Sequence, residues 1–230
     1  MSITTLALYG SCARSDNNES SDIDIFAISN DSEYKMIVQS KMNIASYPER
    51  IAHERARSGD LFMLHICSEA KPIYDPENGL TKLKNNFKYK ESYNLEISLA
   101  SDLGWFLVDN WNTIKNYTLL NRRIAWCVRT ILISKSAQQR APVFSSTGLT
   151  ELSGKNYTQK LIENKNSSIR TPSILELLAA FLSEFGCKRP IEHSQKTSDA
   201  YIKHFIKTQN AMGTKTASSA NSSFDGDDYI

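Results

Sequence analysis

The sequence lacks the features of a membrane-spanning or secreted chain. Its 230 residues contain no apolar run of 18, so we expect no transmembrane helix. Residues 1–9 have neither a basic segment nor a cleavable apolar stretch, so we expect no secretory signal. These absences predict a cytoplasmic protein.

The sequence also has few residues that bind zinc or form disulfides. Its four cysteines include no C-x-x-C pair, and none of its four histidines stands near a cysteine at a zinc-ligand spacing. We therefore expect reduced thiols packed as small hydrophobic side chains, and we assign no histidine to a metal. No repeat of 20–50 residues is visible, which excludes a solenoid.

Charge is nearly balanced overall, at +2, but it is distributed unevenly. Residues 1–34 carry six acidic groups against one basic group, whereas residues 111–170 carry ten basic groups against two acidic ones. An acidic first element and a basic later region suit a polyanion held through divalent cations. A solvated basic surface explains the same pattern equally well, so both interpretations stay open.

The chain divides by composition into three parts, which predict an α+β fold. Residues 1–85 contain strand patterns at 3–9, 22–28 and 41–47 and helix patterns at 32–39 and 48–57. Residues 86–210 have helical spacing of apolar residues and predict a bundle, with the apolar helix after Thr171-Pro172 at its centre. Residues 211–230 are rich in small and polar residues and predict a flexible, disordered tail.

The strongest chemical pattern is Gly10-Ser11 followed, after ten residues, by Asp22-x-Asp24. Glycine permits a tight strand-to-helix turn whose N–H groups face a phosphate, and the Ser11 hydroxyl adds a donor. Arg14, one helical turn on, can pair with a phosphate oxygen. Alternate residues of a strand project to one side, so Asp22 and Asp24 can together bind Mg²⁺ or Mn²⁺.

These residues resemble the DNA polymerase β-type nucleotidyltransferase superfamily, in particular its minimal bacterial members. The resemblance is close over residues 6–28 and extends to the segment at 58–75. It implies a nucleotidyltransferase α/β domain in which Gly10 and Ser11 bind the triphosphate and Asp22 and Asp24 bind magnesium. The reaction implied is attack of a hydroxyl on the α-phosphorus of a nucleoside triphosphate, with release of pyrophosphate.

One position departs from the family pattern. The family usually supplies a third carboxylate from a following strand, and the matching residue here is Asn43. An amide oxygen coordinates magnesium weakly and cannot accept a proton as a base. Another carboxylate such as Asp60 replaces it, or the chemistry uses two carboxylates, or Asn43 has no role.

Arg122, Trp126 and Arg129 fall at i, i+4 and i+7 in the helical region, on one helix face. Two cations around an indole can hold a triphosphate and stack a base, so both arginines are candidate nucleotide-binding residues. The alternative is a core tryptophan with flanking arginines that extend to solvent.

The last part of the chain offers a phenolic hydroxyl at Tyr229. A linker from about residue 210 spans a root-mean-square distance of about 24 Å, which is enough to reach the chain's own site. A compact nucleotidyltransferase with such a tail resembles the Hailong group of antiphage nucleotidyltransferases. That resemblance implies protein-primed synthesis of single-stranded DNA oligomers, chiefly oligodeoxyadenylate from dATP, on Tyr229, with a companion membrane effector held closed by the product.

Other functions remain as alternatives. A minimal nucleotidyltransferase antitoxin would transfer AMP to a partner toxin, and an aminoglycoside adenylyltransferase would modify a drug. A degenerate nucleotide-binding module is the non-enzymatic alternative, suggested by Asn43. The sequence leaves open whether the chain forms a homo-oligomer.

Overall fold

The computed structural model describes residues 2–17, 21–192 and 196–220. In this part of the chain the residues form two compact units. The first unit contains residues 2–91 and 137–145, and the second contains 92–136 and 146–220. Each unit is described by itself.

The first unit is a five-stranded mixed sheet in the order β3-β4-β2-β1-β5. Its elements are β1 (Ile3–Tyr9), α1 (Gly10–Arg14), β2 (Ile23–Ser29), β3 (Lys35–Gln39), β4 (Met42–Pro48), α2 (Glu49–Arg57), α3 (Leu61–Glu69), β5 (Lys71–Tyr74) and α4 (Gly79–Asn86). β2 pairs antiparallel with β1 and parallel with β4, so it lies at the centre of the sheet. The strands predicted at 3–9, 22–28 and 41–47 and the helix at 48–57 are confirmed.

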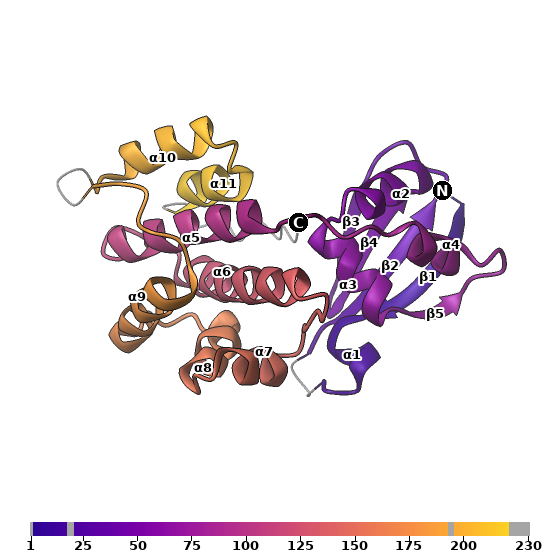
Figure 1. Ribbon diagram of the computed structural model, residues 1–230, viewed down its shortest axis with the longest axis horizontal. Coiled ribbons are helices and arrows are strands. Elements are labelled where there is room, and N and C mark those ends of the chain that lie inside the picture. Colours follow the sequence, from indigo (N-terminus) through magenta and orange to yellow (C-terminus); the bar gives the residue numbers. More distant parts are fainter. Residues whose placement is uncertain (1, 18–20, 193–195, 221–230) are drawn as a thin grey trace. The chain divides into compact units, whose positions relative to one another are not determined.

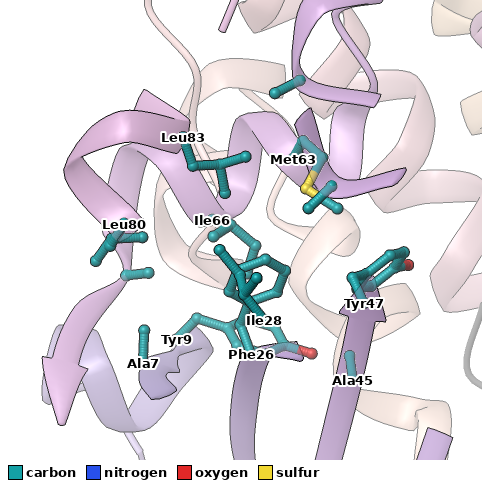
Figure 2. Packing of buried hydrophobic residues seen from close by; sticks show 13 residues of the cluster. Ala7, Tyr9, Phe26, Ile28, Ala45, Tyr47, Met63, Ile66, Leu80 and Leu83 are labelled. Atoms are coloured by element: carbon teal, nitrogen blue, oxygen red, sulfur yellow. The ribbon is translucent and has the colours of Figure 1, made fainter. Parts of the chain in front are cut away.

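One face of the sheet is covered by α2, α3 and α4 (Figure 1). The core between sheet and helices takes every second residue of the three central strands, and Figure 2 shows these side chains packed against Met63, Ile66, Leu80 and Leu83. The strand residues in this core are Ala7, Tyr9, Phe26, Ile28, Ala45 and Tyr47. Asp24 is two residues before Phe26, and Asn43 is two residues before Ala45. Both therefore lie at the end of the helix-covered face.

The expected helix at 32–39 is wrong, because residues 35–39 form β3 instead. β3 pairs along its whole length with β4, in a register that joins Lys35 to Ser46 and Gln39 to Met42. Residues 36–38 are consecutive apolar residues, and in so short a segment this pattern does not distinguish a helix from a strand. The free edge of β4 supplies backbone partners that a helix of that length cannot match, and β-branched Ile37 and Val38 suit a strand.

The second unit is helical. Its elements are α5 (Asn94–Asp109), α6 (Tyr117–Gln138, whose last two residues belong to the first unit), α7 (Ser146–Ser153), α8 (Tyr157–Glu163), η1 (Asn164–Asn166), α9 (Pro172–Phe185), α10 (Ser198–Lys207) and α11 (Ala211–Ser219). The helical character expected of this region is confirmed, but the unit begins at residue 92 rather than 86, excludes residues 137–145 and continues through α11. None of the helices in the described ranges is long and apolar enough to cross a membrane.

In this unit α5 is more completely buried than the helix that follows Thr171. Residues 100–107 of α5 are all buried, and a Cβ at Gly104 would lie 2.8 Å from the Leu182 side chain, so α5 packs closely against α9. In α9, only Ile174, Leu178, Phe181 and Leu182 are buried, so this helix has one buried face. The prediction that α9 is central is wrong, because exposed residues such as Glu176 and Ala180 interrupt its apolar surface.

The prediction of a disordered tail from residue 211 is wrong for its first part, because residues 211–219 form the helix α11. Asn210 begins this helix: its side-chain oxygen accepts from the N–H of Gly213 at 2.9 Å, and its amide donates to the carbonyl of Leu99 at 2.8 Å. A Cβ at Gly213 would lie 2.7 Å from the Phe205 ring. The small side chain of Gly213 is what allows α11 to pack closely against Phe205. The reach of about 24 Å expected for a linker from residue 210 therefore does not hold, because residues 211–219 are helical and packed. The rest of the expected tail, 221–230, lies outside the described residues.

Candidate active site

The two aspartates of the Asp-x-Asp pattern lie at the start of the central strand. Asp22 immediately precedes β2, and Asp24 is the second residue of the strand. Asp24 pairs with Tyr9, the last residue of β1, and on its other side with Asn43 of β4. The sheet register therefore places the turn from β1 into α1 beside Asp24.

Gly10 makes this close approach possible. Its φ is +71°, in the left-handed region, and a Cβ built on it would lie 3.0 Å from Oδ2 of Asp24. Any side chain at position 10 would therefore meet both backbone strain and the carboxylate. The glycine predicted from the sequence as a turn residue is thus also the residue that leaves room for Asp24.

The short helix α1 is connected to the other aspartate. The thiol of Cys12 donates to the backbone carbonyl of Asp22 at 3.5 Å. Gly10, Ser11 and the two aspartates are therefore brought together by the β1–α1 turn and the start of β2, as the sequence pattern predicts. We call Gly10, Ser11, Asp22, Asp24 and Asn43 the carboxylate site.

Asn43 completes this site from the neighbouring strand. Its Nδ2 donates to Oδ1 of Asp24 at 3.2 Å, and its side chain is buried. Asp60, the other residue considered in place of a third carboxylate, has a different role: it accepts from the N–H of Met63 at the start of α3 and pairs with Arg55. In the part of the chain that the structure describes, no group of three or more His, Cys, Asp or Glu side chains could hold a metal ion.

Arg14, predicted to bind a phosphate, is held by two carboxylates. Its Nε donates to Asp16 at 3.0 Å and its Nη1 to Glu69 at 2.5 Å. Burial acts to lower the pKa of Arg14, but these two carboxylates outweigh it and raise the pKa, so the guanidinium stays charged. Its role toward a phosphate stays a prediction.

Glu69 and His65 form a cluster with Arg14 that the sequence pattern did not predict. Nε2 of His65 lies 2.8 Å from the same Glu69 oxygen that binds Arg14, and the His65 ring is stacked on Phe144 at a centroid distance of 4.3 Å. Burial acts to raise the pKa of Glu69, but the hydrogen bonds from His65 and Arg14 lower it overall. The i, i+4 spacing of His65 and Glu69 on α3 is the one sequence signal for this cluster.

Arg122 and Arg129 belong to α6 in the second unit. Together with Trp126 they are half-buried, whereas Arg123, Cys127 and Val128 between them are buried. The three residues thus share one partly exposed helix face, as their spacing predicts. Their role in nucleotide binding stays a prediction, and Tyr229 lies outside the described residues.

Comparison with known proteins agrees with the fold of the first unit. Residues 1–78 match the family described as "Polymerase beta, Nucleotidyltransferase". The matched segment contains the whole carboxylate site and ends before the helical unit. The expected fold class, a polymerase β-type nucleotidyltransferase domain followed by a helical region, is confirmed by this match and by the mixed five-stranded sheet.

Among solved structures, a nucleotidyltransferase-like protein from Exiguobacterium sibiricum 255-15 is similar to this chain. The two are 11% identical, the alignment covers 92% of this chain and 83% of that one, and the TM-score is 0.35. No curated protein matches the chain.

Proposed function

We propose that this chain is a nucleotidyltransferase that uses a divalent cation. An acceptor hydroxyl loses its proton to water, its oxygen attacks the α-phosphorus of a nucleoside triphosphate, a new P–O bond forms, and the bond to the pyrophosphate leaving group breaks. The observation that carries this proposal is the position of Asp24, which the sheet register holds between the Gly10 turn and Asn43 inside the matched segment.

The donor set at this position fits Mg²⁺ or Mn²⁺. Asp22 and Asp24 supply carboxylate oxygens, and proteins commonly hold Mg²⁺ through one or two carboxylates together with the phosphates of the substrate. Oδ2 of Asp24 faces the space that a side chain at Gly10 would fill. When bound there, the cation would supply positive charge that stabilises the charge developing on the phosphate oxygens.

The other residues of the site are proposed to bind and orient the nucleotide. Gly10 and Ser11 offer backbone N–H groups and a hydroxyl at the turn next to the carboxylates. Arg14 is proposed to face the triphosphate, with Glu69 and Asp16 fixing the plane of its guanidinium. Arg122 and Arg129 are proposed to contribute positive charge from the basic helical region toward the nucleotide or a single-stranded product.

The acceptor hydroxyl is proposed to be the phenol of Tyr229. Asn43 cannot take a proton from the acceptor, which favours an acceptor that loses its proton readily. A phenol, with an ordinary pKa of about 10, does so more easily than a sugar hydroxyl. The resemblance noted from the sequence supports dATP as substrate, oligodeoxyadenylate as product, and a companion membrane effector in antiphage defence.

Intact-protein mass spectrometry tests this proposal directly. The purified chain is incubated with Mg²⁺ and each nucleoside or deoxynucleoside triphosphate in turn. A series of nucleoside-monophosphate increments, strongest with dATP, is the expected result for the wild type. Tyr229→Phe should abolish the series, whereas Tyr74→Phe, at a tyrosine that is 52% exposed on β5, should leave it intact.

Other outcomes point to the alternatives. A single AMP on a separate toxin would indicate an antitoxin, and a labelled drug would indicate an aminoglycoside adenylyltransferase. A full series on Tyr229→Phe would remove the tyrosine primer from the proposal. No transfer with any triphosphate, together with nucleotide binding, would leave the nucleotide-binding module.

A further inference from the structure

The contact between Asn43 and Asp24 is the least expected feature of the carboxylate site. The two residues are register partners on parallel strands, so their side chains project from the same face of the sheet. An ionised carboxylate only accepts hydrogen bonds, so the amide of Asn43 must present its nitrogen to Asp24, as it does at 3.2 Å. Asn43 is 5% exposed, and its strand β4 lies inside the sheet, between β3 and β2.

Asp24 is therefore oriented through one of its oxygens before any ligand arrives. Oδ1 accepts from Asn43, and Oδ2 lies 3.0 Å from the position that a Cβ on Gly10 would take. A carboxylate held by a neutral donor needs no cation to remain in place. A second carboxylate at position 43 would instead put two negative charges at hydrogen-bonding distance, an arrangement that requires a cation or a shared proton.

We propose that Asn43 is a positioning residue that orients Asp24 and keeps the site at two carboxylates, so that a divalent cation binds tightly only together with the nucleotide. This inference rests on the proposed function, and it specifies how the site acquires its cation. Two carboxylates alone hold Mg²⁺ weakly, because the ion keeps most of its water. The phosphates of the nucleotide supply the remaining oxygen ligands and negative charge.

The strand next to Asn43 offers a matched control. Gln39 is an exposed amide on β3 that pairs with Met42, so it lies on the opposite face of the sheet from Asn43. Asn43→Asp and Gln39→Glu make the same change, from amide to carboxylate, within one pair of strands. Only Asn43→Asp places the new charge against Asp24.

The experiment measures Mn²⁺ binding by electron paramagnetic resonance of the free ion, with and without a non-hydrolysable dATP analogue. In the wild type, the analogue should tighten Mn²⁺ binding strongly. Asn43→Asp should bind Mn²⁺ without nucleotide at least about ten-fold more tightly than the wild type, because three carboxylates then converge. Gln39→Glu should stay within about two-fold of the wild type, since exposed charges at a distance are screened.

Thermal unfolding provides a second measurement on the same variants. Without metal, Asn43→Asp should melt at a lower temperature than Gln39→Glu, and added Mn²⁺ should restore most of the difference. Asn43→Ala adds no charge and removes the donor to Asp24. It should keep weak binding of Mn²⁺ alone and should weaken the binding of Mn²⁺ with the analogue by about ten- to a hundred-fold, the cost of one hydrogen bond to a charged group.

The proposal is overturned if Asn43→Asp and Gln39→Glu bind Mn²⁺ alone equally, or if the wild type binds Mn²⁺ equally well with and without the analogue. If Asn43→Asp fails to fold even with Mn²⁺, unchanged binding in Asn43→Ala overturns it. These readouts need no turnover. Absence of nucleotidyl transfer would contradict the proposed function while the Mn²⁺ measurements still decide the role of Asn43.

Discussion

The carboxylate site in the first unit and the arginine face of α6 in the second are held by different kinds of neighbour. Asp24 is fixed by a register partner on each side, Tyr9 and Asn43, and by the Gly10 turn. Arg122 and Arg129 stand on a single helix, with Trp126 between them, and all three are half-buried. The residues of the carboxylate site converge on Asp24, whereas the two arginines and Trp126 lie along the surface of one helix.

This difference changes what a single substitution can do. Side chains that contact one another are energetically coupled, so removing one of them changes the positions and interactions of the others. Charges along a partly exposed helix act mainly through a screened field, so each contributes a small, separable amount. We therefore expect large, local effects from the carboxylate site and small, salt-dependent effects from α6.

The largest effect is expected from Asp24→Asn. The variant keeps the size of the side chain and removes one of the two proposed cation ligands, so nucleotidyl transfer should fall by at least about 10³-fold. Asp22→Asn should behave similarly. Asp31→Asn is the control, because it removes a carboxylate whose partner is Lys35 at the surface, and its activity should match the wild type. Comparable activity in Asp24→Asn and Asp31→Asn would contradict the site.

A smaller effect is expected from Gly10→Ala, for which Gly154→Ala is the matched control. Both glycines have positive φ, at +71° and +64°, so either alanine should cost about 1–2 kcal/mol of stability. Only at position 10 does the new Cβ meet another residue, since nothing lies within 4 Å of a Cβ at Gly154. Transfer should fall by about 10- to 100-fold in Gly10→Ala alone, with thermal melting measured alongside.

Glu69→Gln tests a second set of converging side chains in the first unit, because it removes the carboxylate that binds both Arg14 and His65. The free energy of unfolding should fall by about 1–3 kcal/mol, as expected for hydrogen bonds to a charged group. Because the pKa of Glu69 is lowered from 4.5 in the folded chain, its contribution is full above that value and is lost as the pH falls through the lowered pKa.

Urea unfolding at a series of pH values between 6 and 3 should therefore show wild-type and Glu69→Gln curves that converge at the acidic end. Glu54→Gln is the control, because its partner Arg50 and Glu54 itself are 73% and 50% exposed. A difference between wild type and Glu69→Gln that stays constant down to pH 3 would contradict the assigned ion pairs.

The smallest effect is expected from the double variant Arg122→Ala with Arg129→Ala. The apparent KM for nucleotide should rise by about 3- to 10-fold at low salt, and the difference should shrink as salt is added. The control is Lys160→Ala with Lys165→Ala, which removes the same charge from the same basic region. Equal changes in both double variants would mean that the region acts through its total charge and that the α6 face has no specific role.

The local sequence pattern was sufficient to predict most of the strands of the first unit and the turn at Gly10. Alternation predicted the strand that carries Asp24, and the glycine at position 10 predicted the turn beside it. It was not sufficient for β3, because the short run of apolar residues at 36–38 was taken as a helical pattern and its pairing with the open edge of β4 was not known from the sequence. It also missed α11, where small residues such as Gly213 pack against Phe205 rather than leaving the chain unfolded.

The sequence by itself determined which residues are candidates for the chemistry, because Gly10-Ser11 and Asp22-x-Asp24 were recognised by their spacing, and spacing is a local property of strands and turns. Only the tertiary structure decided that Asn43 donates to Asp24 and that Glu69 connects Arg14 to His65. Asn43 lies 19 residues from Asp24, and Glu69 lies 55 residues from Arg14. Their contacts depend on strand register and helix packing, which are set by burial of the whole sheet face and not by any neighbouring residue.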